Sequence, residues 1–304
     1  MSSDLNFYKK NGYLVKKNLI NQKIINQINK VVNQVVSSEK NKRKKNNVNG
    51  TQSYDNYHFV YNSTSSKNKE ILRLNNPQNR HKIFYELSRN KNIISIVKKL
   101  LGGSVRFHLG KLNFKLPNKK KGSEIGWHQD WAFYPHTNDN VLALGLMLND
   151  VTIDNGPLMV IPESHKGPVL SHNNNGVFCG AINPDDKDFD INKAITLTGK
   201  ARSMTIHHAR TLHGSAPNNS DKDRLMLFYE CNSADAWPLV GVGAYLKNVN
   251  PVDLCSQMEN QMVCGQVNYQ PRMENVPVVL PLPPAQDYSS IFTTQKTGGA
   301  KSAF

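Results

Sequence analysis

The sequence predicts a mainly β protein with flanking helices, built around a β-jelly roll. Helical periodicity lies within residues 1–103 of the 304-residue chain. From residue 104 onward, short apolar or alternating runs are separated by Gly, Asn, Asp and Pro, as strands joined by turns require. Helices followed by many short strands are expected of a jelly roll supported by N-terminal helices.

Residues 1–103 are expected to form this helical support. After a short N-terminal segment, apolar residues recur at the spacing of one helical face and predict a helix that ends near residue 37. Residues 38–54 are basic and asparagine-rich, so we expect an exposed loop there. A second helix is expected over 80–101, ending at Gly102-Gly103. The first helical face consists of Ile24, Ile25, Ile28, Val31, Val32, Val35 and Val36.

Residues 104–234 are expected to form the jelly-roll core. Its strands are predicted in the runs "SVRFHLGKLNFKL", "NVLALGLMLNDV", "GPLMVIP", "ARSMTIHHARTLHG" and "RLMLFYECN". Residues 235–304 contain the proline-rich stretch "VPVVLPLPPAQ", so we expect an extended chain packed on the core. No internal repeat is visible, and we expect one domain over 1–304.

The composition favours a globular enzyme over a membrane or nucleic-acid-binding protein. No apolar run is long enough to span a bilayer, and no signal-peptide pattern opens the chain, so we expect a cytoplasmic protein. The four cysteines form no Cys-x-x-Cys pair, which argues against a disulfide scaffold or structural zinc. The net charge of +15 follows from a general excess of Lys and Asn, so neither a nucleic-acid nor a membrane partner is expected.

The stretch "GWHQDWAF", residues 126–133, contains a candidate pair of metal ligands. If residues 126–131 form a strand, His128 and Asp130 point to the same face and Gln129 points away. One imidazole and one carboxylate need a further histidine to complete a facial triad, the arrangement that leaves open positions for non-haem Fe(II) chemistry.

Five histidines downstream are candidates for the third ligand. His172 lies in an asparagine-rich stretch and is expected to be exposed, whereas His165 follows a strand and is expected to organise a turn or support the site. Strand alternation places His207 and His213 on one face of "MTIHHARTLHG", with His208 and Arg210 on the other.

His213 is distinguished by the residues after it. A polar turn and the apolar run "RLMLFYE" follow, and an antiparallel return would place Arg224 back near His213. A guanidinium is well suited to a bidentate grip on a carboxylate, and Ser215 could add a hydroxyl. Together with His128 and Asp130, these residues point to an Fe(II)- and 2-oxoglutarate-dependent oxygenase.

The stretch "WHQDWAFYPHTNDNVLALGLMLNDVTIDNGPLMVIPESHKGPV", with "KLNFK" before it and "HGSAPNNSDKDR" after it, resembles the phytanoyl-CoA dioxygenase family, which includes ectoine hydroxylase-like enzymes. The resemblance covers about residues 6–235. It implies a double-stranded β-helix of the jelly-roll, cupin-like type, in which His128, Asp130 and His213 hold Fe(II).

The resemblance further implies that 2-oxoglutarate is the co-substrate and that O2 is consumed. Arg224 and Ser215 would bind the C5 carboxylate, and Asn113 would help to hold the co-substrate. The chain has Leu109 where ectoine-type enzymes place a glutamine, which puts an ectoine-like substrate mode in doubt. Related halogenases lose the carboxylate of the triad, so Asp130 favours hydroxylation.

The substrate is predicted only as a small molecule. Candidate contacts follow the metal ligands, share the inward face with His213 or lie at the start of the C-terminal segment. They are Trp131, Phe133, Tyr134, His136, His207 and Trp237. Asn155-Gly156-Pro157 is interpreted as a turn between strands.

Three alternatives stay open at this point. The enzyme could act on an acyl-CoA, with a lysine-rich loop at 40–45 for the CoA phosphates, although no peroxisomal signal is present. A catalytically silent jelly-roll binding protein is disfavoured by the complete ligand set. A basic nucleic-acid-binding protein would bind with a steep salt dependence. The sequence does not determine the oligomeric state.

Overall fold

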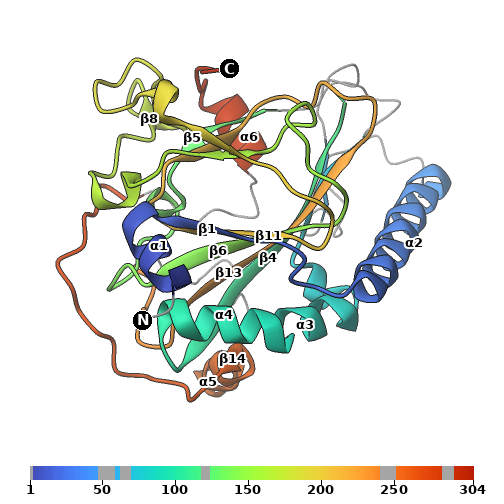
Figure 1. Cartoon of the computed structure of the whole chain (residues 1–304), viewed down its shortest axis with the longest axis horizontal. Helices are drawn as coiled ribbons and strands as arrows, with labels where there is room; N and C mark the ends of the chain where they lie inside the picture. Colours follow the sequence, from blue (N-terminus) through green and yellow to red (C-terminus); the bar gives the residue numbers. More distant parts are fainter. Residues whose placement is uncertain (1–2, 47–58, 62–69, 118–123, 240–250, 283–290) are drawn as a thin grey trace.

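The computed structural model describes residues 3–46, 59–61, 70–117, 124–239, 251–282 and 291–304. Two β-sheets enclose the centre of the molecule (Figure 1). The large, eight-stranded sheet has the order β1-β11-β6-β13-β4-β3-β2, and β14 also pairs with β4. Its strands are β1 (Tyr13–Lys16), β2 (Phe59–Tyr61), β3 (Ile71–Asn75), β4 (Val105–Lys115), β6 (Val141–Met147), β11 (Met204–His208), β13 (Arg224–Ser233) and β14 (Met262–Cys264).

The small sheet has four strands in the order β10-β7-β12-β5. They are β5 (Ile125–His128), β7 (Leu158–Val160), β10 (Ile195–Leu197) and β12 (His213–Ser215). A separate hairpin pairs β8 (Asn173–Asn174) with β9 (Val177–Phe178). The two packed antiparallel sheets confirm the predicted jelly-roll class.

Helices cover the outer face of the large sheet, with α3 and α4 lying along β4 and β13 (Figure 1). The hydroxyl of Tyr229 on β13 donates to the carbonyl of Phe84 on α3 at 2.6 Å. None of the described helices combines the length and apolar character needed to cross a bilayer. The helices are α1 (Ser3–Asn11), α2 (Gln22–Asn46), α3 (Lys82–Ser88), α4 (Lys91–Leu101), α5 (Pro251–Asn260) and α6 (Ile291–Thr297).

Strand alternation gives the large sheet two different faces. On β13, Leu225, Leu227 and Tyr229 belong to the main hydrophobic cluster, which also contains apolar residues of the covering helices. Arg224 and Glu230 alternate with them, and both are buried on the opposite face, toward the small sheet. The large sheet therefore presents polar residues to the space between the sheets.

Two helix predictions need correction. The first helix continues to Asn46, so the loop predicted over 38–54 is wrong for residues 38–46; residues 47–54 lie outside the described residues. The helix predicted over 80–101 is two helices, because the side chain of Asn90 caps a new start by accepting from the amide of Asn92. The predicted end at Gly102 is confirmed, with a φ of 98° there.

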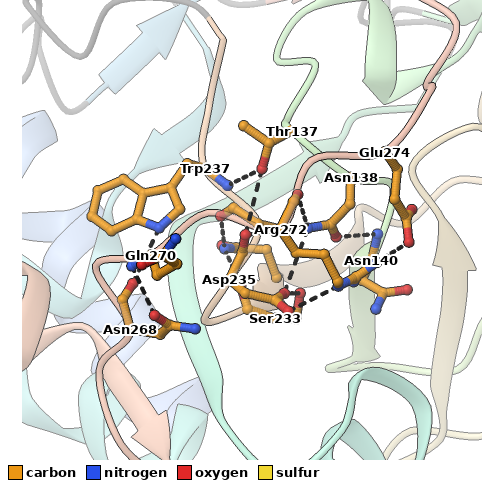
Figure 2. Close-up of polar contacts among 12 residues, drawn as sticks. Thr137, Asn138, Asn140, Ser233, Asp235, Trp237, Asn268, Gln270, Arg272 and Glu274 are labelled. Atoms are coloured by element: carbon orange, nitrogen blue, oxygen red, sulfur yellow. Dashed lines mark hydrogen bonds and ion pairs between the residues drawn. The ribbon is translucent and has the colours of Figure 1, made fainter.

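The prediction of an extended C-terminal chain is only partly right. Residues 265–282 contain no regular helix or strand, but α5, β14 and α6 flank them, since proline-rich sequence is confined to the middle of the segment. Arg272 anchors this extended strap to Asp235, with Nε 2.9 Å from Oδ2, and also pairs with Glu274 (Figure 2). The indole Nε1 of Trp237 donates to the carbonyl of Asn268.

Candidate metal centre

His128, Asp130 and His213 come together between the two sheets. One ligand atom of each lies within 4.8 Å of the others, and all three residues are buried. His128 ends β5 and pairs in register with His213, which begins β12. The Asp130 carboxylate lies 3.7 Å from His128 Nε2 and 3.9 Å from His213 Nε2. Two imidazoles and one carboxylate are the donor set of a facial triad, which leaves the other coordination positions of the metal open.

The expected strand over 126–131 is wrong at its end. β5 stops at His128, and Asp130 begins a 3-10 turn over Asp130–Ala132. Its carboxylate reaches the histidines because the chain turns inward after Gln129, and not because strand alternation points it there.

Backbone carbonyls fix the orientation of both ligand histidines. Nδ1 of His128 lies 2.8 Å from the carbonyl of Gly126, and Nδ1 of His213 lies 2.9 Å from that of Thr211. A carbonyl can only accept, so each Nδ1 carries the proton and each Nε2 offers a lone pair to the centre. The pattern matches the ring orientation that metal-binding histidines need.

Burial favours the neutral form of both rings. It lowers the pKa of His128 to about 4 and the pKa of His213 well below its usual range. Burial opposes ionisation of Asp130, but His213, His207 and Lys111 together outweigh it and hold the pKa of this carboxyl well below its ordinary value. Near pH 7 the site therefore offers neutral imidazoles and a carboxylate, the protonation states in which these groups bind metals.

His172 corrects a sequence prediction, because it is buried and not exposed. Its Nε2 accepts the backbone N–H of Gln129 at 2.8 Å, and its Nδ1 faces the carbonyl of Leu170. The side-chain amide of Gln129 forms three more hydrogen bonds. Its Nε2 donates to the carbonyls of Pro168 and Arg210, and its Oε1 accepts from the backbone N–H of Leu170. The turn between the two ligands is thus tied to the 168–172 segment.

The remaining histidines occupy different sheets. His207 lies on β11 and His213 on β12, so the expected common strand is wrong; yet their rings meet at 4.3 Å, because each points inward from its own sheet. His207 Nε2 lies 3.4 Å from the Asp130 carboxylate. His165 lies in the turn Ser164–Lys166, near the ring of His208, which confirms its placement at a turn.

The strand that begins at Arg224 does not pair with the strand of His213, so the predicted antiparallel return is wrong. β12 pairs with β5 and β7, whereas β13, which begins at Arg224, pairs with β4 and β6. The buried guanidinium donates to the carbonyl of Gly156 at 2.8 Å, and its Nε has no partner among the described residues. Burial lowers the pKa of Arg224 to about 10, so it stays charged at neutral pH.

Lys115, which the sequence analysis missed, lies beside Arg224 in the paired strands. Its ammonium donates to the hydroxyl of Ser215 at 2.6 Å, to the carbonyl of Ser215 and to that of Ala216. Gly156 packs against Lys115 and Ala216 with a φ of 73°, and a Cβ at this position would collide with both residues. The predicted turn at 155–157 is confirmed, with backbone that contacts a candidate site residue.

Arg73 is a second buried cation that the sequence analysis missed. It pairs in register with Asn113, and its Nε donates to the Asn113 side-chain oxygen at 2.8 Å. Burial lowers the pKa of Arg73 to about 10. Nearby on β4, Lys111 forms an ion pair with the buried Glu230. An arginine alternating with leucines in "ILRLN" was the available signal.

The six predicted substrate contacts fall into different surroundings. Phe133 packs edge-on against His128 at 6.0 Å, and Tyr134 lies beside His108. His136 is buried, with Nε2 lacking a partner among the described residues. His207 lies at the triad, as described above. Trp131 is buried and donates to Pro277, and Trp237 packs under Arg106 at 4.4 Å; these two contribute to the support of the C-terminal strap.

The chain is similar in sequence to proteins of known function. Residues 8–226 match the family model described as phytanoyl-CoA dioxygenase (PhyH). The chain is 37% identical over 247 residues to a probable alpha-ketoglutarate-dependent hypophosphite dioxygenase of Stutzerimonas stutzeri, covering 80% of this chain and 82% of that protein. It is 29% identical to an ectoine dioxygenase of S. stutzeri strain A1501, covering 51% and 56%.

Two solved structures have a similar fold. EctD from S. alaskensis with bound Fe has a TM-score of 0.61 at 20% identity and covers 77% of each chain. The epimerase SnoN, in complex with Fe3+, alpha ketoglutarate and nogalamycin RO, has a TM-score of 0.63 at 18% identity and covers 82% of this chain and 90% of its own.

Proposed function

The chain belongs to the phytanoyl-CoA dioxygenase family, and from this premise we propose that it oxidises a small phosphorus oxyanion of the hypophosphite type. It is an Fe(II)- and 2-oxoglutarate-dependent dioxygenase of small molecules, which consumes O2 and releases succinate and CO2. A cytoplasmic location, where 2-oxoglutarate is available, is part of the proposal.

The residues fit the cofactors. His128, Asp130 and His213 would hold the iron, since their donor atoms converge in a buried site and both Nε2 atoms face the centre. When bound, iron with 2-oxoglutarate supplies the O2 activation that protein side chains cannot perform. Arg224 would take the C5 carboxylate of 2-oxoglutarate, with the Ser215 hydroxyl and Asn113 as further contacts. Lys115 would keep Ser215 in place.

One observation carries the substrate proposal: cationic side chains line the large sheet where it faces the triad. Arg73, Lys111, Lys115 and Arg224 stand on the inner face of β3, β4 and β13, and all but Lys111 are at most 5% exposed. One cation, Arg224, suffices for the co-substrate carboxylate, so Arg73 is available to a negatively charged substrate. The relative from S. stutzeri named as a hypophosphite dioxygenase supports the same class.

The proposed reaction is balanced. A P–H bond of hypophosphite becomes P–OH, which gives phosphite; the second oxygen atom of O2 enters succinate, and 2-oxoglutarate loses CO2. The protein's part is to bind the anion, orient its P–H bond and exclude water from the centre.

The acyl-CoA alternative is less well supported. Residues 40–45, the expected loop for CoA phosphates, lie in α2. Leu109 stands on the inner face of β4, opposite Glu230, where ectoine-type enzymes have glutamine. An ectoine-like substrate is correspondingly disfavoured.

The test is a substrate panel with Fe(II)-reconstituted protein. Succinate formation would be measured with hypophosphite, ectoine, L-proline and phytanoyl-CoA, and phosphorus NMR would follow phosphite. We expect hypophosphite to stimulate succinate release, with one phosphite formed per succinate. Stimulation by an amino acid or acyl-CoA, with none by hypophosphite, would overturn the proposal.

A further inference from the structure

We infer that Arg73 holds the charged oxygens of the substrate, and that its subsite prefers an anion with one negative charge over an anion with two. This inference rests on the proposed function. It adds Arg73 as a substrate-binding residue and a preference for singly charged anions, which we call the charge rule.

The guanidinium of Arg73 is held in place without an ion pair to a carboxylate of the described residues. The residue is 5% exposed, and its one hydrogen bond among the described residues runs from Nε to Asn113. Its Cζ atom lies 5.1 Å from the centre of the Phe292 ring on α6. The guanidinium is thus held on two sides, while both Nη groups keep N–H donors for a ligand. Such a fork binds two oxygens of one oxyanion.

The surrounding charges single out Arg73. Lys111 is neutralised by its ion pair with Glu230. Arg224 lies beside Lys115, which donates to the Ser215 hydroxyl, and these residues are assigned to the co-substrate. No carboxylate of the described residues forms an ion pair with Arg73. A buried guanidinium without a partner is costly, so a bound anion would supply the missing charge.

Glu230 limits how much negative charge the subsite accepts. This carboxylate is 2% exposed, and it forms an ion pair with Lys111. It lies near enough to Arg73 to raise the pKa of the guanidinium, as Asp130 also does. One charge on the substrate would balance Arg73, whereas a second would find no further cation there, because Lys111 is already paired with Glu230.

The first experiment measures which ligand depends on Arg73. Wild type, Arg73→Gln, Arg73→Lys and the exposed control Lys99→Gln would be assayed as holoenzymes with varied hypophosphite and 2-oxoglutarate. We expect Arg73→Gln to raise KM for hypophosphite about 100-fold and KM for 2-oxoglutarate less than about 3-fold, with partial rescue by lysine. If KM for 2-oxoglutarate carries the loss, Arg73 serves the co-substrate and the inference is wrong.

The second experiment tests the charge rule by binding alone. Methanesulfonate and sulfate share a tetrahedral shape but differ by one charge. Calorimetric titration of each into the anaerobic Fe(II)–2-oxoglutarate complex should show methanesulfonate binding at least about 10-fold more tightly, and Glu230→Gln should reduce that preference. Equal or tighter sulfate binding by wild type would overturn the rule.

The two proposals fail differently. If wild type oxidises hypophosphite and Arg73→Gln keeps the same KM, only the inference fails. If wild type oxidises no oxyanion but binds methanesulfonate in an Arg73-dependent manner, the anion subsite stands and the proposed reaction fails.

Discussion

The two sheets that enclose the site position their functional residues by different means. The small sheet offers the triad histidines, each oriented by a backbone carbonyl two residues earlier in its own strand or turn. The large sheet offers cations whose placement depends on partners distant in sequence, such as Lys115 with Ser215 and Arg73 with Asn113.

From this difference we infer that the two halves of the proposed site have separate tasks, with metal binding on the small sheet and anion binding on the large sheet. Metal ligands need a fixed ring plane and a defined tautomer, which the local backbone supplies. Anion-binding groups need positive charge without an internal counter-ion. The large sheet keeps Arg73 and Arg224 buried, and within the described part of the chain neither forms an ion pair with a carboxylate. Substitutions on the two sheets should therefore fail in different ways.

The largest effect is expected from loss of the triad carboxylate. Asp130→Ala should abolish tight Fe(II) binding and lower activity by more than the roughly 10–100-fold that changes around a metal site cost. Iron content after desalting and succinate release would measure this. Asp150→Asn, on the surface, is the control and should leave both unchanged; iron retention by Asp130→Ala would contradict the assignment.

On the large sheet, loss of the guanidinium should weaken the co-substrate while sparing the metal. Arg224→Gln should raise KM for 2-oxoglutarate about 100-fold, since a charged bidentate contact is lost. Ser215→Ala should raise it by about 10-fold or less. Steady-state kinetics with varied 2-oxoglutarate measures both values. Loss of iron from Arg224→Gln would instead show that the large sheet also contributes to metal binding, which contradicts the proposed separation.

The turn between His128 and Asp130 can be destabilised without changing a candidate metal ligand, because His172 supports it. His172→Phe removes the acceptor for the Gln129 N–H and should cost about 1–3 kcal/mol of unfolding free energy. His172→Gln keeps an acceptor oxygen and should retain part of that stability. Thermal unfolding of the two variants against wild type would measure it, and equal Tm values for all three would remove His172 from the support.

The strap should contribute least. Burial opposes ionisation of Asp235, but Arg272 and Ser233 outweigh it and lower its pKa. Because the folded-state pKa is depressed, the stabilisation is present above the unfolded value of about 3.9 and disappears as pH falls through the folded value. Asp235→Asn should therefore cost about 1 kcal/mol or less at pH 7 and nothing near pH 2. Denaturant unfolding at both pH values would show the difference; an equal cost at both would exclude the ion pair as its source.

The sequence predicted the local part of the site better than its long-range part. The motif around His128 and the polar turn after His213 identified all three triad residues, although Asp130 reaches the centre from a 3-10 turn. Alternation also predicted that His207 points inward, but not that it belongs to the other sheet, because nothing local marks where the chain crosses between sheets.

Residues whose role depends on distant partners were missed. His172 was predicted as exposed because its neighbours are asparagines, yet its ring is buried against Gln129. Lys115 and Arg73 lie in strands whose pairing with β13 and β4 only the fold reveals. The tail misled similarly, because its prolines concealed the helices on either side of them.

The most direct test of the account is an anaerobic titration of 2-oxoglutarate into the Fe(II) protein, monitored by the visible charge-transfer band of the chelate. We expect a band for wild type and Arg73→Gln at similar 2-oxoglutarate concentrations, a band for Arg224→Gln only at far higher concentrations, and none for Asp130→Ala. A missing band in wild type, or an unchanged band in Asp130→Ala, would contradict it.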